Sequence, residues 1–103
     1  MIEVDFSMMI VCDGNGYCDA KYVDEVLTRT VTLPTINLRG IKFDFDNNLF
    51  LLEKEVTQVT IVVAEDGTYR VHAWLEDWDI SEYTKESFEN KLTALFNSGW
   101  SLQ

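Results

Sequence analysis

The sequence predicts a single α+β domain in which an antiparallel β-sheet of about four to six strands carries a C-terminal α-helix on one face. Several segments alternate apolar and polar residues with a period of two, which is typical of half-buried strands. Near the C-terminus the apolar spacing changes to that of a helix. The 103 residues, 47% of them hydrophobic, suffice for one packed core, so we expect an ordered domain over residues 1–103.

The first strand is predicted over residues 2–12. Its even-numbered residues are apolar from Ile2 to Cys12, whereas Glu3, Asp5 and Ser7 fall on the other side. The segment Asp13-Gly14-Asn15-Gly16 then marks a turn, since its residues tolerate positive φ. Beyond it two interpretations stay open. Asp19 could cap a short helix over 20–29, or the β-branched stretch 28–33 could form a strand that Pro34 ends.

Two hairpins are predicted in the middle of the chain. Residues 41–46 alternate up to an Asn47-Asn48 turn, and residues 49–53 form the returning strand. The second hairpin joins 56–64 to 69–75 through Glu65-Asp66-Gly67-Thr68, where Asp-Gly favours a two-residue type I′ turn with positive φ at Gly67. That turn would pair Val62 with Val71. Both faces of this hairpin carry apolar residues, so we expect it to be central in the sheet.

A helix is predicted from Thr84 onward. Phe88, Leu92, Leu95 and Phe96 form a stripe at helical spacing, and Glu86 lies in the first turn. Gly99 stands where a helix C-terminus commonly has a glycine with positive φ. We expect the stripe to pack against the sheet.

The charge balance excludes some ligands. The chain has 18 acidic and 8 basic residues, a formal net charge of -10, which argues against nucleic acid or an anionic membrane as a direct partner. No long apolar run is present, and acids follow Met1 where a signal peptide needs basic residues, so a cytoplasmic protein is expected. Cys12 and Cys18 are expected to be reduced thiols, because one disulfide is sparse for a secreted domain.

The sequence contains no recognisable catalytic motif. His72 is the only imidazole, and neither a nucleophile elbow nor a phosphate-binding glycine loop accompanies it. Cys12, Cys18 and His72 could supply three zinc ligands, but the cysteine spacing departs from that of structural zinc sites. We therefore predict a non-enzyme without cofactor or metal. A small enzyme or metal-binding module based on these three residues is a third hypothesis for the function, beside the two described below.

Acidic residues are clustered along the chain. Glu76, Asp77 and Asp79 bracket Trp78, the pair Glu65-Asp66 lies at a predicted hairpin tip, and Asp44 and Asp46 project from one side of a strand. Such clusters are often only a solvated surface. They can also pair with the Arg and Lys side chains of a groove that normally binds phosphates.

Two segments resemble a known protein family. The stretch from Val56-Thr57-Gln58-Val59 through Asp66-Gly67 to Val71, and that from Lys91-Leu92 to Gly99-Trp100, are similar to a small, acidic, prophage-encoded anti-CRISPR protein that inhibits the type II-A RNA-guided nuclease. The resemblance implies that Asp66 and Gly67 contact the nuclease. Tyr69 stands where the family has an acid, and the family's acidic stretch after Gly-Trp is missing.

The function expected is a non-enzymatic, phage-type inhibitor that binds a basic nucleic-acid groove of a host nuclease and blocks access of DNA. A bacterial immunity protein that neutralises a toxin nuclease needs the same acidity and size, and it remains the alternative. The residues expected at the interface are Glu65, Asp66, Gly67, Glu76, Asp77 and Asp79.

Overall fold

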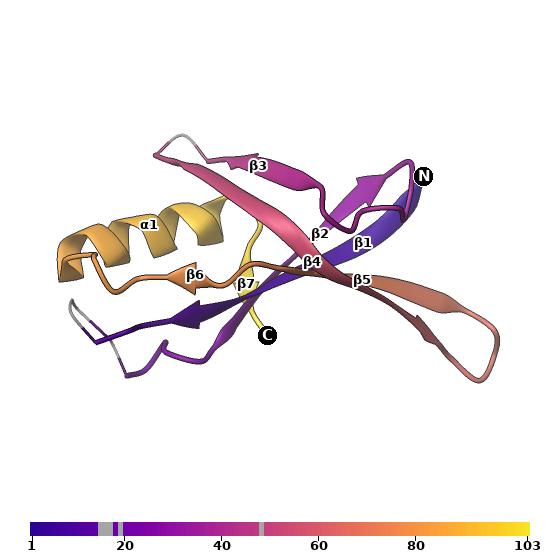
Figure 1. The fold of residues 1–103 in the computed structure, drawn as a ribbon, viewed down its shortest axis with the longest axis horizontal. Helices are drawn as coiled ribbons and strands as arrows, with labels where there is room; N and C mark the ends of the chain where they lie inside the picture. Colours follow the sequence, from indigo (N-terminus) through magenta and orange to yellow (C-terminus); the bar gives the residue numbers. More distant parts are fainter. Residues whose placement is uncertain (15–17, 19, 48) are drawn as a thin grey trace.

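The computed structural model describes residues 1–14, 18, 20–47 and 49–103, and these form seven strands and one helix (Figure 1). The elements are β1 (Ile2–Val11), β2 (Val26–Leu33), β3 (Lys42–Asp46), β4 (Leu51–Val63), β5 (Tyr69–Leu75), β6 (Trp78–Asp79), α1 (Lys85–Asn97) and β7 (Ser101–Leu102). The predicted α+β class is confirmed.

The sheet has the strand order β3-β4-β5-β1-β2-β7, and β6 pairs separately with β1. The strand β1 is antiparallel to β2 but parallel to β5 and β6. The sheet is therefore mixed, and the prediction of an antiparallel sheet was wrong on this point. A period of two identifies a strand and its buried side, but it carries no information on the direction of the neighbouring strand.

The core lies between one face of the sheet and α1. Phe6 on β1 contacts Phe43 and Phe45 edge-on, with ring centroids 5.0 Å and 5.6 Å away. Phe88 of the helix lies 5.8 Å from the ring of Trp78. The fully or nearly fully buried core residues of β1 and α1 are Val4, Phe6, Met8, Ile10, Phe88, Leu92 and Leu95. This face therefore carries most of the packing that holds the domain together.

The helix α1 begins and ends as predicted. The hydroxyl oxygen of Thr84 accepts a hydrogen bond from the backbone N–H of Ser87, and Gly99 has a φ of 102°. The N–H of Trp100 donates to the carbonyl of Leu95 at 3.0 Å, which returns the chain over the helix end. Phe96 is 39% exposed, so its predicted core position was wrong, because it lies about 100° around the helix from Leu95.

Residues 20–29 do not form a helix. The β-branched stretch extends further than expected, and Val26–Leu33 pairs with β1 over its whole length. Asp24 has a φ of 68° and its N–H donates to the carbonyl of Ile10, which ends any helical path. The strand alternative is thus confirmed. Asn15, Gly16 and the expected cap Asp19 lie outside the described residues.

Cys12 and Cys18 form a disulfide, so the prediction of reduced thiols was wrong. Their Cα atoms are 5.9 Å apart, which lies within the range that a disulfide requires. Gly14, two residues after Cys12, has a φ of 98°, which glycine adopts without strain. The prediction rested on the small number of cysteines, which carries no information on how close the two lie in the fold.

The hairpin of β3 and β4 is confirmed, but β4 is longer than predicted. It runs unbroken for 13 residues, where two separate strands were expected over 49–53 and 56–64. A bulge between Val56 and Gln58 lets one strand follow β3 first and β5 afterwards. Asn48 of the predicted turn lies outside the described residues.

The turn between β4 and β5 contains three residues instead of two. The N–H of Gly67 donates to the carbonyl of Ala64, and the N–H of Ala64 donates to the carbonyl of Thr68. This is a type I turn followed by a glycine with positive φ, here 85°. The positive φ at Gly67 is confirmed. The two-residue type I′ turn was wrong, and the cross-strand pairs between the turn and the bulge shift by one, so Val71 pairs with Ile61.

The distal part of this hairpin projects from the body of the protein on the side away from α1 (Figure 1). Residues 60–70 are all exposed, although β4 and β5 are inside the strand order as expected. The radius of gyration is 14.6 Å, larger than the ~13 Å of a compact domain of this length. The molecule is accordingly elongated, with extents of 45 × 27 × 23 Å.

Candidate functional site

The tip of the β4–β5 hairpin carries three of the residues predicted from the sequence, Glu65, Asp66 and Gly67. The side chain of Asp66 is held by Thr68, whose N–H and hydroxyl donate to Oδ1 at 3.0 Å and 2.6 Å. These bonds, the hydroxyl bond first, lower the pKa of Asp66. The tip therefore presents an ionised carboxylate in a fixed position.

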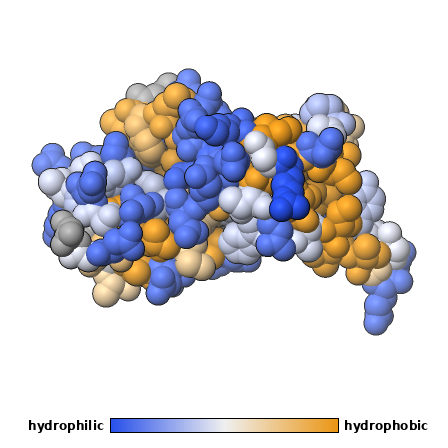
Figure 2. All heavy atoms as spheres, viewed as in Figure 1, coloured by the Kyte–Doolittle hydropathy of each residue, from blue (hydrophilic) through white to orange (hydrophobic). Residues whose placement is uncertain are grey.

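The hairpin behind the tip is apolar on its surface. Ile61, Val62, Val63 and Tyr69 are 48%, 54%, 68% and 57% exposed. Figure 2 shows hydrophobic side chains over this projecting half of the molecule, with hydrophilic ones at its end. A cluster of exposed large apolar side chains rimmed by charge is typical of an interaction surface.

The other predicted residues, Glu76, Asp77 and Asp79, follow the opposite end of β5. The side chains of two of them accept hydrogen bonds within the protein. Glu76 accepts the N–H of Glu55 at 2.7 Å, and Asp79 accepts the N–H and hydroxyl of Ser81. The bonds from Ser81, the hydroxyl bond first, lower the pKa of Asp79. Asp77 is exposed, and its backbone carbonyl accepts a hydrogen bond from the amine of Lys54 at 2.7 Å.

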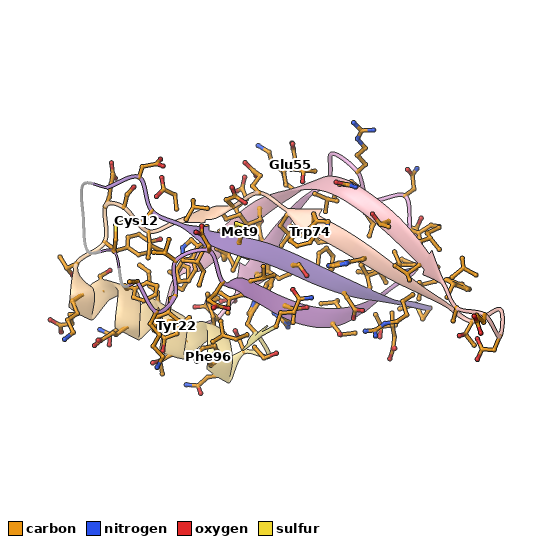
Figure 3. All side chains as sticks on the ribbon, turned by 90° about the horizontal axis from the view of Figure 1, so that it is seen from below. Met9, Cys12, Tyr22, Glu55, Trp74 and Phe96 are labelled. Carbon is orange, nitrogen blue, oxygen red and sulfur yellow. A yellow bond between two sulfur atoms is a disulfide. The ribbon has the colours of Figure 1, made fainter. Side chains whose placement is uncertain are left out.

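Two further acids join this second group. Glu53 lies opposite Asp44 on the outer side of the β3–β4 hairpin, and Glu55, labelled in Figure 3, bonds to Glu76 through its backbone. Lys42 partly compensates the negative charge of Glu53, with which it forms an ion pair at 3.8 Å. The sequence interpretation placed neither residue at the expected interface. The signal was present, since Glu53 and Glu55 alternate in the same way as Asp44 and Asp46.

The structure does not bring the two predicted groups together. Glu65 and Asp66 precede β5 and Glu76 and Asp77 follow it, so the seven residues of this strand, about 23 Å, separate them. They form two acidic ends of one long element rather than one patch.

A polar cavity that the sequence interpretation missed lies on the sheet face opposite α1. It has a volume of about 390 Å³, and its lining residues are Asp5, Ser7, Thr28, Thr30, Val62, Arg70, His72 and Gln103. Alternation along β1 points Asp5 and Ser7 to this face, while Val4 and Phe6 point to the core. Met9 and Trp74, labelled in Figure 3, lie on the same side of their strands as this polar row.

Asp5 is the anion of this cavity. Its carboxylate accepts the hydroxyl of Thr30 at 2.7 Å and pairs with the guanidinium of Arg70 at 2.6 Å. The bond from Thr30 and the charge and bond of Arg70 outweigh the partial burial, so the pKa of Asp5 is lowered. The cavity therefore already contains a compensated ion pair.

Ser7 and His72 also meet here, with Oγ and Nε2 at 2.7 Å. The pair has the elements of a nucleophile and its base. Ser7 is only 1% exposed and lies within a central strand, whose backbone N–H groups serve the sheet rather than an oxyanion hole. The arrangement suits a buried hydrogen bond that joins β1 to β5 better than it suits acyl transfer.

The metal-binding alternative has lost two of its three ligands, because Cys12 and Cys18 are joined in a disulfide. In the part of the chain that the structure describes, no three His, Cys, Asp or Glu side chains are grouped as a metal site would need. Nor does any helix of that part have the length and apolar character needed to cross a membrane.

Comparison of the chain with protein-family models, with curated proteins and with solved structures found no match in any of the three.

Proposed function

We propose that this protein is a non-enzymatic inhibitor that inserts its β4–β5 hairpin into a basic nucleic-acid groove of a nuclease and blocks access of DNA. The observation that carries the proposal is the projecting hairpin with an ordered, ionised tip. Residues 60–70 are exposed, and Asp66 is fixed by Thr68. Nothing in the packing of the body requires this extension, so a binding role accounts for it best.

The two acidic ends of the hairpin support a long groove as the target. They are separated by about 23 Å, which is shorter than one turn of duplex DNA at about 34 Å. A groove that accommodates a duplex is therefore long enough to contact both ends with its Lys and Arg side chains. The exposed Ile61, Val62 and Val63 between them would bury apolar surface in the same complex.

We further propose that the nuclease is an RNA-guided CRISPR effector, which is the target that the resemblance of the hairpin and helix segments implies. Such an inhibitor would act in the host cytoplasm.

The test measures binding to a type II-A RNA-guided nuclease and inhibition of its DNA cleavage. The variant reverses two charges, Glu65→Lys with Asp77→Lys, at side chains that make no bond holding the fold. Asp66 and Glu76 are left unchanged because Thr68 and Glu55 depend on them. We expect association to slow by about tenfold or more and cleavage to recover.

The matched control is Glu89→Lys together with Glu86→Lys, which makes the same change in charge on the exposed side of α1. It should inhibit nearly as well as the wild type. Raising the salt from about 0.1 M to about 1 M shortens the Debye length from about 10 Å to about 3 Å and should weaken the wild type most. Failure to bind this nuclease, with salt-sensitive binding to a toxin nuclease instead, would replace the CRISPR target by the immunity function.

A further inference from the structure

The outer edge of β4 is open along its distal half. The strand β3 pairs with Leu51–Glu55 of β4. The loop that precedes β3 covers Val56, whose N–H donates to the carbonyl of Ile41 and whose carbonyl accepts the N–H of Gly40. Beyond Val56, none of the described strands pairs with this side of β4. The open edge, residues 57–63, is thus a row of unpaired backbone groups beside exposed apolar side chains.

The direction of those backbone groups follows from the turn. Ala64 bonds to Thr68 across the hairpin, so Val62 and Thr60 also direct their backbone groups toward β5. The N–H and carbonyl groups of the alternate residues, Val59, Ile61 and Val63, therefore face the open edge. A second strand could pair with these three residues without disturbing a bond of the monomer.

The charge distribution favours another copy of this chain as that second strand. Two molecules with a formal charge of -10 repel each other over most of their surfaces, but residues 56–64 contain no charged side chain. The protective devices usual at an exposed edge, an inward lysine or a proline, are absent from this segment. The open edge is where two copies approach at the lowest electrostatic cost.

The two ends of the open edge are complementary in charge. Arg39 lies at the inner end, where it lines a hollow with Thr57, Gln58 and Val59 and forms no ion pair with any described residue. Glu65 lies at the outer end. In an antiparallel pair with its two-fold axis at Ile61, Val59 faces Val63 of the other copy and Thr57 faces its Glu65. Each Arg39 then meets the Glu65 of the other molecule.

We propose that two copies of this protein form a dimer by antiparallel pairing of their open β4 edges about Ile61. The pairing adds about six backbone hydrogen bonds and two Arg39–Glu65 contacts. Both molecules pair through the same edge, so no free edge remains and the assembly ends at two copies. The dimer proposal does not rest on the proposed nuclease target. Because the dimer contact covers Glu65 at the hairpin tip, a molecule in the dimer could not also bind the nuclease through that tip.

Analytical ultracentrifugation without any nuclease, from low micromolar to millimolar concentration, tests the dimer. The wild type should shift from monomer to dimer mass. Ile61→Lys places two like charges at the axis and should weaken association by about tenfold or more. Leu51→Lys makes the same change at a residue 61% exposed but outside the open edge, and it should associate as the wild type does.

A mixing experiment tests the register. Arg39→Glu and Glu65→Lys should each associate weakly alone, since each places like charges at both ends of the pair. An equimolar mixture of the two variants should dimerise, because the heterodimer restores an opposite-charge contact at each end. A mixture no tighter than its components would overturn this pairing. A wild type that stays monomeric at millimolar concentration would overturn the dimer and leave the strand of another protein as occupant.

Discussion

The helix-covered half of the sheet and the projecting hairpin contain the same kinds of residues but use them differently. In the covered half, Phe6, Phe88 and Leu95 are fully buried. In the hairpin, Ile61, Val62 and Val63 are about half exposed or more. Burial of apolar area stabilises the fold only in the first region. The apolar side chains of the second are free to contribute the same free energy to an association.

The largest difference between the two halves should appear on truncation of a leucine in the helix and of a valine in the hairpin. Leu92→Ala removes a side chain that is only 4% exposed and should lower the free energy of unfolding by about 2–5 kcal/mol. Val63→Ala, at 68% exposure, should stay within about 0.5 kcal/mol. Urea denaturation measures both. Similar losses would mean that the hairpin is packed after all.

A smaller effect is expected at the hairpin turn. Gly67 has a φ of 85° and nothing lies within 4 Å of an added Cβ, so a substitution there acts through the backbone alone. Gly67→Val should cost about 1–2 kcal/mol. Gly67→Asn, which tolerates positive φ, should cost clearly less. Thermal denaturation of the two variants compares them, and equal melting temperatures would contradict the turn geometry.

The hydrogen bond between Ser7 and His72 should contribute less again. Ser7→Ala removes a buried hydroxyl and should destabilise the protein by about 1 kcal/mol. The control Ser101→Ala changes an exposed serine and should have almost no effect. If both variants unfold at the same urea concentration as the wild type, the bond does not join β1 to β5.

The smallest effect concerns acid. The pKa of Asp5 is lowered in the folded state, so the folded protein binds its proton only at a lower pH than the unfolded chain does. The stability from this group is therefore present above about pH 4 and is lost as the pH falls through the folded pKa. Asp5→Asn should flatten the decline of the melting temperature below about pH 4. A decline as steep as in the wild type would contradict this.

Much of the fold was predictable from local patterns. The alternation from Ile2 to Ile10, the stripe of Phe88, Leu92 and Leu95, and the position of Gly99 all describe what one segment does by itself. These features depend on period and on φ, both of which a sequence expresses directly.

The features that could not be predicted depend on partners far along the chain. The parallel pairing of β1 with β5, the choice of strand over helix before Thr28 and the Cys12–Cys18 disulfide each follow from where another segment lies. The same holds for the candidate site. Its acids were found by composition, but their separation by β5 and the bond between Ser7 and His72 needed the register of the sheet.

The central claim is that the outer edge of β4 is covered up to Val56 and open beyond it. Residue-resolved amide hydrogen exchange tests this claim at low micromolar concentration, where the monomer prevails. We expect the amide of Val56 to be protected and those of Val59, Ile61 and Val63 to exchange fast, while Thr60 and Val62, bonded toward β5, exchange more slowly. Uniform protection from Val56 to Val63 would contradict the account, because the hairpin would then already be covered.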